Sequence, residues 1–327
     1  MRKLKYFVLS MLVISLALTA GIHLYNKEDS NVLQGEKLDW QKDMNPFTGE
    51  VLQEEELATR PLLFTIDNTS TARPQAGLKE ADIIYEVPVE GGITRFLALY
   101  YGHLPERVGP IRSARPYIVQ LAVENEAMLL HAGSSPGGYQ LLSDLDALHL
   151  DEIYQGKYYW RENKGRKAPH NLFTGKKELA ELVRILPPIN FRPRFDFART
   201  TQDEAGTALS EIKVRFWGKE IIFMSGGDGI VRKLNGQKST GEVQVANLIV
   251  HYLPVHLIKG DREGRLEMEL AGKGKALVFS NGRAIEASWQ KEAGGWSEYE
   301  TGSGEPVTFA TGSTWIILVP ENAEVSY

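Results

Sequence analysis

Short runs of almost entirely apolar, β-prone residues set the main limit on how this chain can fold. Four such runs lie between residues 61 and 131: Leu62–Ile66, Ile83–Val89, Phe96–Tyr101 and Met128–His131. Their residues are apolar on successive positions, whereas a strand with one face in water alternates apolar with polar residues. We therefore expect a sheet that is covered on both faces.

Helix start signals lie between and after these runs, each a serine or threonine ahead of a proline or an apolar face: Ser113 before Pro116, Ser135 before Pro136, and Thr174 before Leu179. Such residues favour the first turn of a helix because they pair its free backbone N–H groups or match its backbone angles. Strands that alternate with helices predict an α/β layered domain over residues 61–200.

Beyond residue 201, glycine-containing turns separate the β-prone runs. Asn235-Gly236 and Asn281-Gly282 are typical of tight hairpins, and the runs include Val243–Tyr252, Ala276–Phe279 and Thr314–Val319. This pattern predicts a smaller, mainly antiparallel β domain over residues 205–327. The expected fold class is therefore α+β overall, an N-terminal α/β layered domain followed by the β-rich one.

The N-terminal segment indicates a membrane anchor. Three basic residues precede a seventeen-residue apolar run from Tyr6 to Ile22. This length is short for a membrane span but exceeds the hydrophobic region of most cleaved signals. We favour an uncleaved signal anchor over residues 1–24, with a cleaved signal peptide as the alternative. Residues 25–60 are then a charged tether, and the basic flank predicts a single-pass cell-membrane protein whose bulk is extracytoplasmic.

Composition excludes several classes of site and partner. The chain has no cysteine, which removes disulfides, thiolate metal sites and lipid anchors attached through a cysteine. A net charge of −5 argues against nucleic acid as a partner. The segment from Lys157 to Arg199 nevertheless holds eleven basic and four acidic residues. This tract indicates either an anionic partner or a solvated basic face.

Polar side chains gather where the apolar runs of the first predicted domain end, which is where open α/β sheets hold ligands. Two arginines and Ser113 precede a predicted helix, whose free N–H groups, with guanidinium forks, suit a phosphate or carboxylate. The arginines could instead form structural ion pairs with Glu86, Glu90 or Asp82. The candidate ligand-binding residues are Asp67, Asn68, Arg73, Gln75, Glu90, Arg95, Arg112, Ser113, Arg115, Ser134, His170 and Asn171.

Three catalytic readings remain open for the carboxylates and histidines. Glu86 could act as a general acid, with Glu90 as the second carboxylate of a glycosidase-like pair, or be a structural ion-pair partner. His131 and His170 could each be an acid–base or phosphate-contacting group, or could hydrogen-bond a loop backbone. Asp67 and Asp82 could hold Mg²⁺ for phosphoryl transfer, and no other cofactor is expected.

Several long motifs occur in one order: NPFTGE, RPLLFTIDN, ARPQAGLKEADIIYEVPVEGGITRF, VGPIRSARPY, HAGSSP and APHNLF. Through them the chain resembles the YerB-like lipoproteins of the bacterial envelope over about residues 45–325. The resemblance implies an exported two-domain envelope protein and brings no activity with it. That family often carries a lipobox cysteine, whereas Leu18-Thr19-Ala20 is followed here by Gly21.

A second likeness concerns the order of motifs alone. An acidic strand end, TRFLALYY, PIRSARP and a glycine-rich HAG loop follow one another as in the LytR-CpsA-Psr phosphotransferases. Those enzymes attach glycopolymers to cell walls, using arginines and a carboxylate-bound metal. The full arginine and aspartate motifs of that family are not reproduced here.

The leading hypothesis is a membrane-anchored, extracytoplasmic cell-envelope protein that binds an anionic or phosphorylated cell-wall glycan or its lipid-linked precursor. One alternative is an enzyme, either an envelope glycopolymer phosphotransferase or a glycan hydrolase. Another is a scaffold for envelope-synthesis proteins, in which the polar cluster serves stability. The sequence leaves open whether the protein is catalytic.

Overall fold

The computed structural model describes residues 43–52, 60–163, 165–189, 192–198, 211–226, 229–233 and 242–327. The predicted anchor over residues 1–24 lies outside these ranges, as does most of the predicted tether over 25–60. Within the described ranges, no helix is both long enough and apolar enough to cross a membrane.

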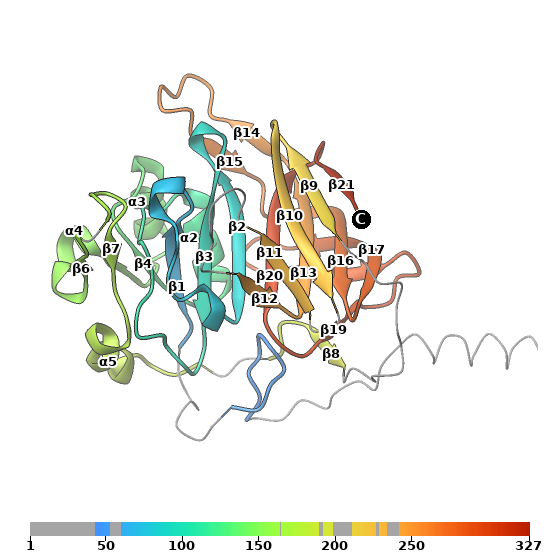
Figure 1. Cartoon of the computed structure of the whole chain (residues 1–327), viewed down its shortest axis with the longest axis horizontal. Coiled ribbons are helices and arrows are strands. Elements are labelled where there is room, and N and C mark those ends of the chain that lie inside the picture. Colours follow the sequence, from blue (N-terminus) through green and yellow to red (C-terminus); the bar gives the residue numbers. More distant parts are fainter. Residues whose placement is uncertain are drawn as a thin grey trace, which may run out of the picture.

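In this part of the chain, ten strands form one mixed sheet (Figure 1). Five come from the N-terminal half: β1 (Leu62–Asp67), β2 (Ile83–Val89), β3 (Ile93–Tyr100), β4 (Met128–His131) and β5 (His149–Asp151). Five come from the C-terminal half: β13 (Asn247–Leu253), β16 (Gly272–Ser280), β17 (Arg283–Lys291), β18 (Glu298–Thr301) and β20 (Thr314–Pro320). The strand order is β18-β17-β16-β13-β20-β2-β3-β1-β4-β5.

The two halves meet through a strand pair in the middle of this sheet. Strand β20 runs parallel to β2, in register from Ile83 opposite Thr314 to Glu86 opposite Ile317. On its other side β20 pairs in parallel with β13. The sequence predicts a domain boundary between residues 200 and 205. The ten-stranded sheet contains strands from both sides of this boundary, and the division into two domains stays a prediction.

A second, five-stranded sheet packs on one face of the first. Its strands, in the order β12-β11-β10-β9-β21, are β12 (Val243–Val245), β11 (Gly229–Lys233), β10 (Lys219–Gly226), β9 (Ile212–Phe216) and β21 (Glu324–Ser326). The ring of Phe223 lies 5.7 Å from that of Trp315, which lies 5.3 Å from that of Phe96. These aromatic contacts join the two sheets into one apolar core.

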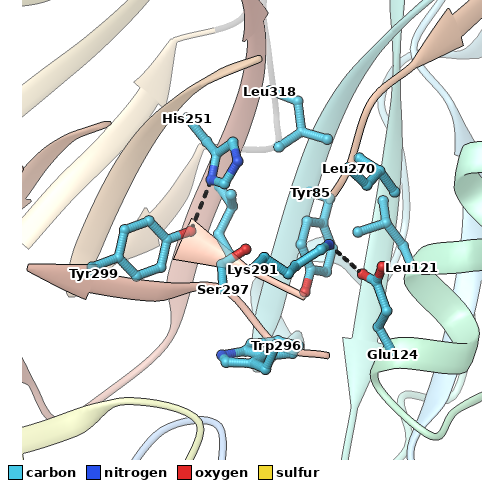
Figure 2. A pocket seen from close by; sticks show the side chains of 11 residues that line it. Tyr85, Leu121, Glu124, His251, Leu270, Lys291, Trp296, Ser297, Tyr299 and Leu318 are labelled. Carbon is cyan, nitrogen blue, oxygen red and sulfur yellow. Dashed lines mark hydrogen bonds and ion pairs between the residues drawn. The ribbon is translucent and has the colours of Figure 1, made fainter. Parts of the chain in front are cut away.

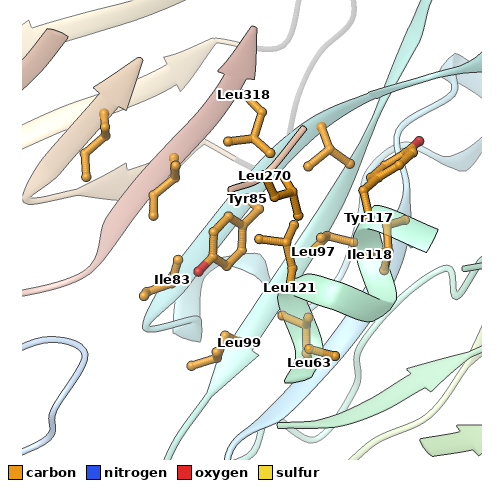
Figure 3. Packing of buried hydrophobic residues seen from close by; sticks show 14 of the residues in the cluster. Leu63, Ile83, Tyr85, Leu97, Leu99, Tyr117, Ile118, Leu121, Leu270 and Leu318 are labelled. Atoms are coloured by element: carbon orange, nitrogen blue, oxygen red, sulfur yellow. The ribbon is translucent and has the colours of Figure 1, made fainter. Parts of the chain in front are cut away.

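Helices cover the opposite face of the ten-stranded sheet. Ile118 and Leu121 of α2 (Pro116–Glu124) pack against Leu63 and Leu97, as Figure 3 shows. Leu142 of α3 (Pro136–Asp144) joins the same cluster. Helix α5 (Lys176–Ile185) is an exception, because its Leu179 belongs to the apolar cluster on the side of the five-stranded sheet.

Shorter elements connect these layers. The short strand pairs are β14 (Val255–Leu257) with β15 (Leu266–Met268), β8 (Asp196–Ala198) with β19 (Thr308–Ala310), and β6 (Trp160–Arg161) with β7 (Leu172–Phe173). The short helices are η2 (Ser70–Ala72), η3 (Leu78–Glu80), η4 (Glu90–Gly92), α4 (Glu152–Gln155) and η5 (Gly156–Tyr158).

The predicted α+β class agrees with this architecture in outline. Strands outnumber helices, and the large sheet is mixed. The first three predicted strands and Met128–His131 correspond to β1, β2, β3 and β4, and β1, β2 and β4 are buried along their whole length. Asn281-Gly282 forms the predicted hairpin between β16 and β17, with positive φ at both residues. Asn235-Gly236 lies outside the described residues.

Helix starts were predicted less accurately. The hydroxyl of Ser135 caps α3 as expected. Helix α2 begins after Arg115 rather than Ser113, and α5 begins after Gly175 rather than Thr174. The hydroxyl of Ser113 instead accepts a hydrogen bond from the Arg115 side chain, and that of Thr174 donates to Tyr158 O.

Candidate functional site

Three loops converge where β1 ends. Asp67, the last residue of β1, lies opposite Arg95 near the start of the antiparallel strand β3. The first loop covers residues 68–77, and the second contains Gly109 and Pro110. Ala76 N–H donates to Gly109 O at 2.8 Å, which joins these two loops, and Asp67 N–H donates to Pro110 O at 2.8 Å. Arg166 of the third loop, residues 165–171, donates to Pro74 O. Each loop contains a cis peptide bond before proline: Arg73-Pro74, Gly109-Pro110 and Ala168-Pro169.

The carboxylate of Asp67 is the centre of this site and is 2% exposed. Its Oδ2 accepts a hydrogen bond from His170 Nδ1 at 2.7 Å and lies 3.3 Å from Arg112 Nε. Its Oδ1 accepts from Thr69 N–H at 2.9 Å. Burial raises the pKa of Asp67, but these hydrogen bonds and the charge of Arg112 outweigh it, so the net pKa is lowered. Asp67 is therefore ionised at neutral pH.

Two arginines face this single carboxylate. Arg112 keeps 26% of its side chain exposed, and among the described residues nothing hydrogen-bonds its two Nη atoms. Arg95 is buried, and its Nη1 donates to Ser113 O at 2.6 Å. Burial lowers the pKa of Arg95 to about 10, and the charge of Arg112 contributes to that lowering, so Arg95 remains cationic at pH 7.

A chain of hydrogen bonds leads from the loop into the interior. Asn68 Nδ2 donates to Thr94 Oγ1 at 2.8 Å, and that hydroxyl donates to Glu86 Oε1 at 2.8 Å. Arg232, on β11 of the five-stranded sheet, donates through Nε and Nη2 to both oxygens of Glu86 at 3.1 Å. This chain connects the strand end to the interface between the sheets.

Arg73 and Gln75 join the loop to this chain. Arg73 Nη2 donates to the backbone and side-chain oxygens of Asn68 at 3.2 Å. Gln75 Nε2 donates to Asp67 O at 2.9 Å and to Asn68 Oδ1 at 3.2 Å. Within the described chain, Arg73 Nε and Gln75 Oε1 are buried without a hydrogen-bond partner. Burial and the charge of Arg232 lower the pKa of Arg73.

These residues form what we call the strand-end cluster: Asp67, Asn68, Arg73, Gln75, Glu86, Thr94, Arg95, Arg112, His170 and Arg232. It holds four guanidinium groups and two carboxylates, an excess of two positive charges before His170 is counted. Such an excess in a partly buried site favours an anion.

Five other predicted ligand-binding residues lie outside this cluster: Glu90, Ser113, Arg115, Ser134 and Asn171. Arg115 forms an ion pair with Glu90 and donates to the hydroxyl of Ser113 at 2.9 Å. Asn171 is buried, and its Nδ2 donates to Glu162 O at 3.0 Å, so it holds the segment beside β6. Ser134 Oγ is buried and has no partner in the described chain.

The prediction that His131 is an acid–base catalyst is wrong because the side chain has no exposed surface. Its Nδ1 lies 2.9 Å from the carbonyl oxygen of Gly133, which can only accept, so Nδ1 carries the proton. Its Nε2 therefore accepts from Nδ1 of His149 at 3.0 Å. Both ring nitrogens are occupied, and burial lowers the pKa of His131.

The predicted glycosidase-like pair of Glu86 and Glu90 is also wrong. Glu86 has no exposed surface, and both its oxygens accept hydrogen bonds from Arg232. Glu90 is paired with Arg115 instead. An enclosed and fully paired carboxylate cannot protonate the oxygen of a bound glycan.

Asp67 and Asp82 do not share a Mg²⁺ site. They lie at opposite ends of β3, because Asp67 is opposite Arg95 whereas Asp82 N–H donates to Leu99 O. The carboxylate of Asp82 accepts from Asn45 Nδ2 at 2.8 Å and from Tyr101 N–H at 2.6 Å. Burial raises its pKa to about 7. The prediction of a joint metal site is therefore wrong.

Sequence analysis missed the polar groups that join the two halves. Figure 2 shows one such place, where Lys291 reaches Glu124 beside a cavity of about 20 Å³. Lys291 Nζ lies 2.7 Å from Glu124 Oε2, which joins β17 to α2, and beside it, within the C-terminal half, His251 Nδ1 lies 3.0 Å from Tyr299 Oη. Arg232 was missed for the same reason: its partner is 146 residues away, and nothing in its local pattern distinguishes it from an ordinary strand residue.

Comparison with known proteins identifies the family. Residues 47–185 match the N-terminal domain, and residues 231–316 the C-terminal domain, of the family described as "Protein of unknown function (DUF3048)". "Putative lipoprotein YerB" of Bacillus subtilis (strain 168) is 31% identical over 292 residues, which are 84% of this chain and 86% of that protein.

A solved structure extends the match to three dimensions. The crystal structure of YerB protein from Bacillus subtilis is similar with a TM-score of 0.75 and 28% identity, covering 87% of this chain and 99% of that chain. These findings confirm the resemblance that the sequence motifs carry. The chain therefore belongs to the DUF3048 family of YerB-like proteins.

Proposed function

We propose that this protein binds an anionic, phosphorylated cell-wall glycan through the strand-end cluster, at the outer face of the cell membrane. The observation that carries the proposal is the charge balance of the cluster, in which four arginines face two carboxylates. A bound phosphate would offset the excess positive charge that the fold holds there.

Arg112 is the group best placed to meet the ligand. Asp67 lies against its Nε, which leaves the two Nη atoms with no protein partner in the described chain. A guanidinium held on one side can offer its free N–H groups to the oxygens of a phosphate as two parallel hydrogen bonds. Ion pairing with Asp67 orients this group before the ligand arrives, which reduces the entropy cost of binding.

The surroundings of Arg112 suit a sugar phosphate better than a simple ion. Gln75 Oε1 is a buried acceptor without a partner in the described chain, and a glycan hydroxyl could donate to it. Ser70 and Thr71, on the same loop, expose further hydroxyl groups. Acceptors beside cationic donors match a ligand that carries both hydroxyl and phosphate groups.

The basic tract extends the positive surface beyond the cluster. Arg166 donates to Pro74 O, which brings the loop over residues 165–171 against the loop that holds Arg73. Lys167, next in sequence, is exposed. Positive charges spaced along the surface favour a polymer with repeated phosphates over a single small anion.

The membrane location rests on the apolar N-terminal run and on the relative that is named a lipoprotein. An exported protein held at the membrane would meet wall polymers and their lipid-linked precursors. The cluster would then act within reach of the site where these polymers are assembled.

Binding of the full-length protein in detergent micelles to a purified wall polymer of repeating polyol phosphates tests the proposal. We expect binding that weakens as salt rises and that falls at least about tenfold in Arg112→Ala, as for loss of a charged hydrogen bond. Arg215→Ala is the matched control, because Arg215 is exposed and pairs with Glu220 on the five-stranded sheet. Equal affinity of folded Arg112→Ala and wild type would refute the assignment and favour a structural ion-pair cluster.

A further inference from the structure

We propose that the strand-end cluster hydrolyses a phosphodiester bond of the anion it holds, with His170 as the proton acceptor for the attacking water. The proposal rests on the binding function given above and adds an activity to it. The geometry that carries it is the pairing of His170 and Arg112 with one carboxylate oxygen of Asp67.

The protonation of the imidazole follows from its partner. Asp67 is buried and ionised, so its carboxylate can only accept a hydrogen bond. The 2.7 Å contact with His170 Nδ1 therefore places the proton on Nδ1. In the neutral ring, Nε2 then holds a lone pair and can take a proton.

The side chain of His170 is accessible to solvent, whereas that of His131 is not. Its side chain is 25% exposed, and no group in the described part of the chain hydrogen-bonds Nε2. The Nδ1 side is fixed by Asp67 and lies 3.2 Å from Thr69 Oγ1. An imidazole that is held on one nitrogen and open on the other is the arrangement required of a general base.

The same carboxylate oxygen brings the anion-binding group next to this base. Oδ2 of Asp67 lies 2.7 Å from His170 Nδ1 and 3.3 Å from Arg112 Nε. A phosphodiester held by the Arg112 guanidinium is thus within reach of a water molecule bound to His170. Arg95 adds a second positive charge close to Asp67, which would stabilise charge that develops on the phosphoryl oxygens.

The reaction is balanced with water as the only co-reactant. Nε2 of His170 takes a proton from water as the water oxygen forms a bond to phosphorus. The bond from phosphorus to the leaving alcohol oxygen breaks, and that oxygen takes its electron pair and a proton from solvent. The imidazolium returns its proton to solvent, which leaves a phosphomonoester and an alcohol.

Release of 4-nitrophenolate from bis(4-nitrophenyl) phosphate, together with new phosphomonoester ends on a purified polyol phosphate polymer, tests this activity in the full-length protein. We expect His170→Asn to lower the rate by about 100-fold or more, as for loss of a general base. The matched control is His256→Asn, because His256 is exposed and pairs with Glu269 away from the cluster.

Two further measurements separate catalysis from structure. Added imidazole should restore part of the rate to His170→Ala, which a folding defect would not allow. Asp67→Asn should also lose activity, because its amide can donate to Nδ1 and so favour the proton on Nε2. The wild-type pH–rate profile should contain a rising limb that His170→Asn lacks.

Failure of this proposal is distinguishable from failure of the binding function. If wild type binds the polymer with Arg112 dependence but cleaves neither substrate above the His170→Asn background, the hydrolytic activity is refuted and binding stands. Absence of Arg112-dependent binding would overturn both.

Discussion

Arg232 and Glu86 form a two-pronged ion pair, with Arg232 Nε and Nη2 each 3.1 Å from a Glu86 oxygen and at most 6% of either side chain exposed. The pair joins β11 of one sheet to β2 of the other. We expect Arg232→Met to destabilise the protein by about 3–5 kcal/mol, because it leaves the Glu86 charge buried and unpaired.

Urea unfolding monitored by tryptophan fluorescence measures this loss. The double variant Glu86→Leu with Arg232→Met should regain much of it, since both charges are then removed. A single variant as stable as wild type would mean that the pair contributes nothing at the interface between the sheets.

Gly109→Ala should destabilise the protein by about 1–3 kcal/mol and weaken ligand binding. Gly109 has a φ of +142°, and a Cβ there would lie 2.7 Å from Leu172 O, so the loops of the strand-end cluster would have to move apart. Gly218→Ala is the control, because it has a φ of +71° with nothing within 4 Å. If both variants bind polymer equally, close packing at Gly109 does not position the cluster.

Protonation of His251 should weaken the fold in mild acid. Burial, with a smaller effect from Lys291, lowers the pKa of His251 from 6.5 to about 3. Between these values the unfolded chain binds a proton that the native state does not, so stability is present above pH 6.5 and is lost as pH falls. The expected slope is up to about 1.4 kcal/mol per pH unit.

Chemical unfolding at several values between pH 7 and pH 4 measures that slope. His251→Gln should show a shallower one, and the difference isolates His251 because His131 titrates in both proteins. Identical slopes would show that His251 is not buried as a neutral ring.

Lys291→Met should be more destabilising at pH 7 than near pH 5. Burial raises the pKa of Glu124 and Lys291 lowers it, so without the lysine the carboxyl should remain protonated to higher pH. A raised pKa means that stability is present at low pH and is lost as pH rises through the folded pKa. Thermal unfolding of Lys291→Met and of the double variant that combines it with Glu124→Gln checks this. The double variant should lack this pH dependence.

Local pattern was sufficient to predict most buried strands of the N-terminal half. Strand β2 contains seven residues that are all buried, and such a run has few alternatives to a central strand. Site residues such as Asp67, at the end of β1, and Arg112 and His170, on loops, could also be named, since polar groups at strand ends are recognisable from the sequence. Their actual partners could not be named, because pairing depends on which loops meet in space.

Long-range pairing escaped prediction for a physical reason. Arg232 and Lys291 lie on strands whose local sequence satisfies ordinary β patterning, and only the packing of the two halves buries their charges. His131 is an error in the opposite direction. From the sequence, a histidine at a strand end resembles a catalytic group, but in the fold hydrogen bonds occupy both of its ring nitrogens. Burial depends on the assembled fold and cannot be inferred from the residues next to it in the sequence.

The parallel pairing of β2 with β20 bears on how the chain is made. About 225 residues separate the two strands, so at 5–20 residues per second β20 follows β2 by roughly 10–45 s. During that time one edge of β2 has no partner strand, and an open apolar edge can pair with other chains. Synthesis of this protein thus includes an interval in which an incomplete sheet must be shielded from aggregation, and any factor that accompanies the new chain would act on that edge.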